Sequence, residues 1–233
     1  MEKIKKLQEM IDKSNNIVFF GGAGVSTDSG IKDFRGNRGI YKNSLEYLLS
    51  RSCFENEPAI FYEFYKKEMN SLNALPNKTH KYLKQLEDKG KLKAIITQNI
   101  DGLHQKCGSK KVYEIHGTIY KNHCVKCHKS YNAEEIFNSK GIPRCTCGGI
   151  IKPDVTLYEE SLPEDFLKAI EEIKKADMLI VAGSSLVVEP ASSLINFFTG
   201  KYLVIINYDK TKYDKQANLV INENIKDVFS QLK

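Results

Sequence analysis

The sequence contains no apolar run that approaches the roughly 18 residues that a membrane-spanning helix requires. The longest candidate, residues 178–188, is short and includes Gly183, Ser184 and Ser185. The N-terminal residues MEKIKK also lack the apolar centre of a secretory signal. We therefore expect a cytoplasmic protein that does not enter a membrane.

A strong excess of one charge is missing as well. The 233 residues include 35 Lys or Arg and 29 Asp or Glu, which gives a net charge of +6, and only four of the basic residues are Arg. The lysines are scattered along stretches with helical spacing, where they normally lie on solvated helix faces. No basic tract is clustered enough to predict a specific nucleic-acid partner.

The composition that remains is that of a globular chain. Hydrophobic residues make up 41% and charged residues 27% of the sequence, which excludes a wholly disordered protein. At this length we expect one large domain, or one domain that carries a small module.

Apolar periodicity predicts alternating helices and strands. A helix is expected over about residues 2–13, followed by a short buried strand, Ile17–Phe20, that runs into a glycine-rich turn. Further strands are predicted at residues 92–97, 112–115, 178–182, 202–207 and 219–221, and helices at 57–89 (broken near Pro76), 163–175 and 190–198. This alternation predicts an α/β fold, a Rossmann-like open parallel sheet with helices on both faces.

The segment 120–152 interrupts this pattern. It has few large apolar residues and contains Cys124-x-x-Cys127 and, after 17 intervening residues, Cys145-x-Cys147. Two close cysteine pairs favour a tetrahedral zinc site, and a site with four cysteines is closed and therefore structural. His123 and His128 flank the first pair and are alternatives to one cysteine ligand. We predict an inserted small zinc-binding module.

The glycine-rich turn predicts phosphate binding. Gly22-x-Gly24 permits close approach of a phosphate, but Thr27 stands where a dehydrogenase fingerprint has its third glycine. The loop Asp33-Phe34-Arg35 offers an anchor for an amide, a ring that can cover a ribose, and a bidentate phosphate ligand. The pattern indicates dinucleotide binding without hydride transfer.

Further polar residues follow the predicted strands, where open α/β sheets bind ligands. They are the segments TQNIDGLH at 97–104, EIHGT at 114–118 and Gly183-Ser184-Ser185, together with Asn207. His116 is a candidate general base, because histidine exchanges protons near neutral pH.

Together these motifs resemble those of the sirtuins, the silent-information-regulator family of NAD-dependent protein deacylases, in their bacterial form. The resemblance spans about residues 16–207 and is carried by the segments GAGVS at 22–26, SGI at 29–31, DFR at 33–35, TQNIDGLH at 97–104, His116-Gly117, the paired cysteines and Gly183-Ser184-Ser185. It implies a large Rossmann-like NAD-binding domain and a small zinc domain, with the active site in the cleft between them. We expect the large domain to comprise residues 1–34, 72–119 and 153–233, the helical part of the small domain with the cofactor loop 35–71, and the zinc module 120–152.

The resemblance also assigns site residues. It implies a catalytic role for His116 and Asn99 and zinc ligation by Cys124, Cys127, Cys145 and Cys147. The positions that match NAD-binding residues are Ala23, Thr27, Asp33, Phe34, Arg35, Gln98, Asn99, Ile100, Asp101, His116, Ser184, Ser185, Asn207 and Ile225. The positions that match the family's peptide-clamping strands are Val155, Leu157, Tyr158, Val187, Val188 and Glu189.

The implied reaction is transfer of the acetyl group from a protein lysine to ADP-ribose. The acyl oxygen attacks the anomeric carbon of the nicotinamide ribose and nicotinamide leaves. His116 then activates a ribose hydroxyl, and the products are free lysine, nicotinamide and O-acetyl-ADP-ribose. NAD is therefore a cosubstrate, the partners are acetylated lysine-containing proteins or peptides, and we expect a monomer.

Two positions depart from the common family pattern. Glu159 replaces a glycine in the segment after Val155, which stiffens that loop and adds charge near the cleft. Members that remove succinyl groups carry a Tyr-x-x-Arg pair, and here Tyr65-Lys66-Lys67-Glu68 stands at that place. Glu68 repels a carboxylate, so we expect deacetylation in preference to desuccinylation.

Three other functions remain open at the level of sequence. Mono-ADP-ribosyl transfer uses the same anomeric carbon and would leave label from NAD on a target protein. A non-catalytic zinc-bearing module for nucleic acid predicts salt-dependent DNA affinity without NAD consumption. A plain NAD dehydrogenase predicts hydride transfer, and the missing third glycine opposes it.

Overall fold

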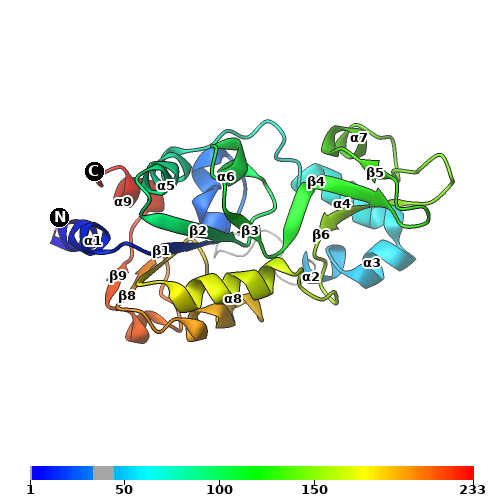
Figure 1. The fold of residues 1–233 in the computed structure, drawn as a ribbon. Coiled ribbons are helices and arrows are strands. Elements are labelled where there is room, and N and C mark those ends of the chain that lie inside the picture. The colour runs from blue at the N-terminus through cyan, green and yellow to red at the C-terminus, as the bar shows by residue number, and fades with distance from the viewer. Residues whose placement is uncertain (1, 34–44) are drawn as a thin grey trace.

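Six parallel strands form the central sheet of the computed structural model, which describes residues 2–33 and 45–233 (Figure 1). The strand order is β3-β2-β1-β7-β8-β9 and every neighbouring pair is parallel. The strands are β1 (Ile17–Gly21), β2 (Leu92–Thr97), β3 (Val112–Glu114), β7 (Met178–Ala182), β8 (Tyr202–Ile206) and β9 (Leu219–Ile221). The order reverses between β1 and β7, and such a switch point opens a crevice at the carboxyl ends of the strands.

Helices cover both faces of this sheet (Figure 1). One face packs against α1 (Glu2–Lys13), α5 (Lys78–Asp88) and α9 (Ile225–Phe229), and the other against α8 (Asp165–Lys175) and the 3₁₀ helix η3 (Ala191–Phe197). Strands β1 and β7 are buried along their whole length, as expected for a sheet covered on both sides. Short helices η1 (Ala23–Val25), η2 (Thr27–Ser29), α6 (Leu103–Lys106) and η4 (Asp214–Gln216) complete this part.

A smaller part projects from the carboxyl edge of the sheet (Figure 1). Its antiparallel sheet has the order β5-β4-β6, formed by β4 (Gly117–Cys124), β5 (Ser130–Tyr131) and β6 (Ile151–Val155). Around it lie α2 (Leu45–Leu48), α3 (Arg51–Asn56), α4 (Pro58–Glu68) and α7 (Ala133–Phe137). Within the described ranges, no helix combines the length and apolar character needed to cross a bilayer.

The segment that contains the four paired cysteines shares a core with helix α4. Phe61, Tyr62 and Tyr65 of α4 are buried, and the ring of Tyr65 stacks on Phe137 of α7 with centroids 5.5 Å apart. The hydroxyl of Tyr62 donates to the carbonyl of Ile151 in β6. Segment 120–152 has few large apolar residues of its own, and helix α4 supplies large apolar side chains to their shared core.

The structure confirms the predicted α/β architecture, including the first helix and the strands of the large sheet. Two details differ. Residues 191–197 form a 3₁₀ rather than an α-helix, and the hydroxyl of Ser193 bonds back to the carbonyl of Pro190. The three small-part strands and α7 were not predicted, although the capping box of Asn132 and Glu135 marks the start of α7 in the sequence.

Two histidines, one on α5 and one on α6, lie side by side in the core. The rings of His80 and His104 are 4.7 Å apart, and both side chains are buried. His80 Nδ1 accepts from the amide of Asn77, while neither ring nitrogen of His104 has a hydrogen-bond partner among the described residues. Burial lowers the pKa of His80 to about 4 and that of His104 well below its ordinary value.

We predict that this histidine pair makes the fold sensitive to acid. The folded pKa of each ring lies below the unfolded value of about 6.5, so the unfolded state binds protons first as the pH falls. Stability is full above pH 6.5 and declines below it, by on the order of 2 kcal/mol for His80 at pH 5. Thermal unfolding of wild type and His80→Gln between pH 5 and 8 measures this. Equal pH slopes for the two proteins would contradict the prediction, whatever acid sensitivity the cysteine cluster adds to both.

Candidate functional site

A cavity of about 750 Å³ lies between the carboxyl edge of the large sheet and the smaller part. This volume suits a sizeable ligand, since small-molecule sites typically measure about 300–1,000 Å³. Segments far apart in the sequence line it, from the turns after β1, β2 and β7 to the end of α4 and the loop after β6. Among the predicted site residues, its lining includes Ala23, Asp33, Gln98, Asn99, Ile100, Asp101, His116, Val155, Leu157, Tyr158, Ser184, Ser185, Val188 and Glu189.

Glycines bring the turns after β1 and β7 into contact. The amide of Gly24 donates to the carbonyl of Gly183 over 2.9 Å. A Cβ on Gly24 would lie 2.7 Å from Gly183 Cα, and one on Gly22 would lie 2.7 Å from Gly183 O. Gly183 itself has φ 63°, in the left-handed region that favours glycine. The glycines therefore set the width of the crevice at the switch point.

A buried carboxyl group anchors the turn after β2. Asp101 is 5% exposed, and it accepts hydrogen bonds from the Ser26 hydroxyl at 2.6 Å and the Leu103 amide at 2.9 Å. Burial raises the pKa of Asp101, and these two hydrogen bonds oppose that shift. The Ser26 hydroxyl also accepts from Asn99 Nδ2 at 3.0 Å, and Asn99 Nδ2 donates to the carbonyl of Gly22. Ser26 thus joins the turns after β1 and β2 into one polar network.

His116 lies at the point where the chain leaves the large sheet for the smaller part. Its Nδ1 is 3.1 Å from the backbone carbonyl oxygen of Gln98. A carbonyl oxygen only accepts, so in the neutral ring Nδ1 carries the proton and Nε2 keeps its lone pair. Nε2 is therefore the nitrogen that can act as a base. The side-chain Nε2 of Gln98 donates to Ser184 Oγ at 2.8 Å, which links this region to the turn after β7.

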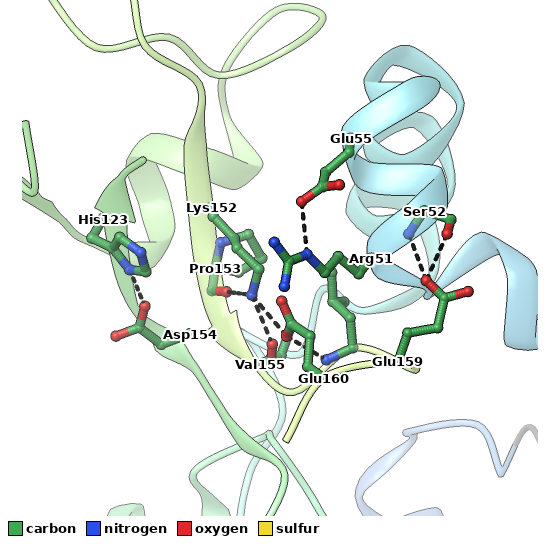
Figure 2. A network of polar contacts seen from close by, with 11 residues as sticks. Arg51, Ser52, Glu55, His123, Lys152, Pro153, Asp154, Val155, Glu159 and Glu160 are labelled. Carbon is green, nitrogen blue, oxygen red and sulfur yellow. Dashed lines mark hydrogen bonds and ion pairs between the residues drawn. The ribbon is translucent and has the colours of Figure 1, made fainter. Parts of the chain in front are cut away.

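The cavity wall where the peptide side is predicted, residues 155–158 and 187–189, consists mainly of loops rather than of paired strands. Val155 ends β6, and Tyr158 forms a single parallel bridge with Ser50. Residues 187–189 form no strand, and they have no neighbouring strand to pair with in the described part of the chain. The carboxylate of Glu159 accepts hydrogen bonds from Ser52, which hold this side chain at the start of α3 (Figure 2).

Some predicted site residues lie away from the cavity lining. Among the described residues these are Thr27, Val187, Asn207 and Ile225. Thr27 is exposed and its hydroxyl donates to the carbonyl of Gly24, whereas Ile225 is buried in the core near Gly183. Val187 is 71% exposed. Phe34 and Arg35 lie outside the described residues.

An ion pair that sequence reasoning did not identify lies in the wall of the cavity. Lys32 Nζ is 2.9 Å from Glu68 Oε2, and the Glu68 side chain is only 3% exposed. The pair connects the segment before residue 34 to the end of α4. Sequence reasoning also missed the hydrogen bond of Ser26 to Asp101, for which the only signal was the place of Ser26 in the GAGVS segment. No pattern in the sequence indicated that Lys32 pairs with Glu68.

The four predicted metal ligands converge. The Sγ atoms of Cys124, Cys127, Cys145 and Cys147 all lie within 4.8 Å of one another, and the three closest pairs are 3.4–3.5 Å apart. A tetrahedral zinc site with Zn–S bonds of about 2.3 Å separates its sulfurs by roughly 3.8 Å. No histidine joins this cluster in the described part of the chain, and His123 Nδ1 binds Asp154 instead.

The surroundings of the cluster suit thiolate ligands. The backbone amides of Lys126 and Cys147 donate to Cys124 Sγ and Cys145 Sγ. The amide of Cys147 is the main cause that lowers the pKa of Cys145 to about 5. A Cβ at Gly149 would lie 2.6 Å from Cys124 Sγ, so only glycine leaves room for the sulfur there. The residues present therefore fit a structural zinc ion.

Comparisons with known proteins agree with this geometry. The Sir2 family model matches residues 22–190. An NAD-dependent protein deacetylase of Clostridium perfringens is 53% identical over 240 residues, which cover 99% of this chain and 98% of that protein. A Sir2 variant solved with a deacetylated p53 peptide and 3′-O-acetyl ADP ribose superposes with a TM-score of 0.92 at 39% identity, covering 98% of this chain and 96% of the other. A Sir2–p53 peptide–NAD⁺ complex has a TM-score of 0.89 at 38% identity, with coverages of 98% and 96%.

We predict one zinc ion per chain that is required for folding of the smaller part. Cys127→Ser removes one of four ligands, so the variant should lose its zinc and unfold roughly 10 °C below wild type. Atomic emission spectroscopy and thermal unfolding measure the two effects. Cys107→Ser is the matched control, because Cys107 is half-buried and lies outside the cluster. Zinc loss from both variants, or wild type without zinc, would refute the assignment.

Proposed function

The chain belongs to the Sir2 family, and on that premise we propose that it is an NAD-dependent protein lysine deacetylase that transfers the acetyl group to ADP-ribose and releases nicotinamide. The deacetylase relatives and the Sir2 complexes with NAD⁺ and peptide support this proposal. The observation that carries it is His116, which faces the cavity with Nδ1 tied to the Gln98 carbonyl beside Asn99 and Asp101.

The glycine turns supply the NAD-binding side. In the proposed assignment, Ala23 and Ser184 lie against the phosphates, where the close backbones of Gly24 and Gly183 leave room for them. Asn99 and Asp101 bound the nicotinamide, and Ser26 holds both side chains through its hydroxyl. The remaining proposed NAD contacts are Thr27, Asp33, Phe34, Arg35, Gln98, Ile100, Ser185, Asn207 and Ile225.

His116 acts as the general base in this proposal. With its Nδ1 proton donated to the Gln98 carbonyl, Nε2 accepts the proton of a ribose hydroxyl and so makes that oxygen a nucleophile. His116 lines the cavity, and its carbonyl accepts a hydrogen bond from the Thr156 amide, so it adjoins the loop after β6. Base and acyl-lysine are thereby brought to one point.

The protein substrate binds as an extended strand between two loops in this proposal. Val155, Leu157 and Tyr158 form one side, and residues 187–189 form the other. An added strand pairs through main-chain hydrogen bonds, which gives affinity with loose sequence preference. Val187 is 71% exposed and its neighbours form no strand among the described residues, so this edge is accessible.

The zinc ion, held by the four cysteines, supplies structure rather than chemistry. The cluster shares the core of α4 and the loop after β6, so it orients the peptide side of the cavity. We retain as proposals the domain division given by the sequence, namely residues 1–34, 72–119 and 153–233 for the large domain. The monomeric state, the lack of a nucleic-acid partner and the cytoplasmic location also stay predictions.

We further propose that acetyl-lysine is preferred to succinyl-lysine. Glu68 lines the cavity. It stands at the position that matches the arginine of the Tyr-x-x-Arg pair in family members that remove succinyl groups. Lys32 neutralises it at 2.9 Å, so simple repulsion is weaker than the sequence suggested. A succinyl carboxylate would nevertheless have to compete with the nearly buried Glu68 for the Lys32 amine, whereas an acetyl methyl makes no such demand.

Replacement of the proposed base tests the mechanism. His116→Ala should slow deacetylation of an acetyl-lysine peptide by roughly 10²- to 10⁴-fold, because the variant lacks the side chain proposed to take the proton. Mass spectrometry with and without NAD follows loss of acetyl and formation of O-acetyl-ADP-ribose. The control is His128→Asn, which changes an exposed histidine at φ 59°, a conformation that asparagine accepts. Label from NAD that stays on a target protein, without deacetylation, would establish ADP-ribosyl transfer instead.

Comparison of acyl groups tests the proposed preference for acetyl-lysine. Wild type should turn over acetyl-lysine peptides at least about tenfold faster than succinyl-lysine peptides, since charge recognition commonly decides such ratios. Glu68→Gln leaves the Lys32 amine beside a neutral amide and should raise relative succinyl turnover severalfold. Glu171→Gln, at an exposed ion pair of α8, is the control. Faster succinyl than acetyl turnover in wild type would overturn the proposal.

A further inference from the structure

The loop that closes the peptide side of the cavity contains a backbone conformation that its residue rarely adopts. Glu159 has φ 75°, in the left-handed region where an L side chain crowds the following carbonyl. It is also the position at which this sequence departs from the glycine of many sirtuins. A glutamate there needs an interaction that offsets the unfavourable backbone, and the structure contains one.

The carboxylate of Glu159 binds the start of helix α3 (Figure 2). One oxygen, Oε2, accepts from the Ser52 amide at 2.9 Å and from the Ser52 hydroxyl at 2.7 Å. These hydrogen bonds lower the pKa of Glu159, so the group is charged at neutral pH. Charge-assisted hydrogen bonds of this kind are roughly twice as strong as neutral ones.

The same two segments are also joined through their backbones. The Tyr158 amide donates to the Leu49 carbonyl at 3.0 Å, and the Arg51 amide donates to the Tyr158 carbonyl at 3.0 Å. Glu159 therefore closes a set of four hydrogen bonds between residues 49–52 and the loop. It is the one side chain among these contacts that reaches from the loop to α3.

The loop is also fixed to β6, through Glu160. Glu160 Oε2 accepts from the Leu157 amide at 2.9 Å and from Lys152 Nζ at 3.1 Å. Lys152 Nζ also donates to the carbonyl of Val155 (Figure 2). The loop is thus held on two sides, by Glu160 to β6 and by Glu159 to α3.

We propose that Glu159 is a positioning residue for the protein substrate: through Ser52 it keeps residues 155–160 in the conformation that presents Val155, Leu157 and Tyr158 to an extended acyl-lysine peptide. This inference rests on the proposed function. Its physical basis is that a loop already ordered does not lose conformational entropy when the peptide binds. A loop that is ordered only part of the time weakens apparent affinity by that fraction.

The decisive variant is Glu159→Gly. Glycine accepts φ 75° without strain, so the fold and the zinc site should persist while the bond to Ser52 is lost. The KM for an acetyl-lysine peptide should rise about three- to tenfold, with kcat and the KM for NAD unchanged. Glu159→Gln keeps an acceptor oxygen and should restore most of the wild-type KM. Glu55→Gln is the matched control, because it changes an exposed carboxylate of α3 that pairs with Arg51.

A double-mutant cycle separates this bond from general damage to the loop. Ser52→Ala removes the hydroxyl donor and should raise the peptide KM about twofold in wild type, yet change nothing in Glu159→Gly. Additive effects of the two changes would show that Ser52 and Glu159 act independently. That result, or an unchanged KM in Glu159→Gly, or an equal KM increase in Glu55→Gln, would overturn the proposal.

Direct measurements distinguish failure of this inference from failure of the proposed function. Fluorescence anisotropy gives the Kd of a labelled acetyl-lysine peptide without turnover, and hydrogen exchange of the Tyr158 and Arg51 amides reports order in the loop. Wild type that binds the peptide but never deacetylates it contradicts the proposed function alone. In that case a higher peptide Kd and faster amide exchange in Glu159→Gly than in wild type still support the inference. Equal Kd values and equal exchange rates in the two proteins refute it. Wild type that binds no acyl-lysine peptide refutes both.

Discussion

The contact between the turns after β1 and β7 is the constraint on which the rest of the site depends. The Gly24 amide bonds to the Gly183 carbonyl at 2.9 Å, and a Cβ at Gly24 would lie 2.7 Å from Gly183 Cα. Two backbones that approach so closely bring the ends of neighbouring parallel strands to one place. Ser26 then connects to Asp101, and Gln98 to Ser184, across that junction. The polar network of the crevice is a consequence of this approach, because larger residues would separate its members.

A second close approach lies in the smaller part, where β4 begins beside the end of β6. Gly117 has φ 76°, and a Cβ there would lie 1.9 Å from the carbonyl oxygen of Asp154. The antiparallel pairing of β4 with β6 at this point brings the Thr156 amide to the carbonyl of His116. The proposed base and the loop of the peptide side therefore share one backbone contact. A change in the smaller part that shifts β6 is transmitted to both at once.

Much of this was readable from local sequence because it depends on short-range chemistry. Buried strands show as apolar runs, and the paired cysteines give metal ligands by spacing alone. The residues at strand ends could be placed at one edge, since parallel strands all finish on the same side of the sheet. By contrast, the strands of the smaller part have mixed burial, and their apolar partners Phe61 and Tyr65 come from a helix that precedes them by about fifty residues. No local pattern announces such a shared core.

The sequence by itself determined the parallel α/β architecture, the four-cysteine cluster and the identity of the strand-end residues, because each follows from periodicity, spacing or motif. Only the tertiary structure decided which polar groups face one another. Lys32 meets Glu68, the Glu159 carboxylate binds Ser52 across 107 positions, and His116 Nδ1 meets the Gln98 carbonyl. A hydrogen bond depends on distances of about 3 Å and on direction. Such geometry arises only once the packing of whole elements has fixed where each side chain lies.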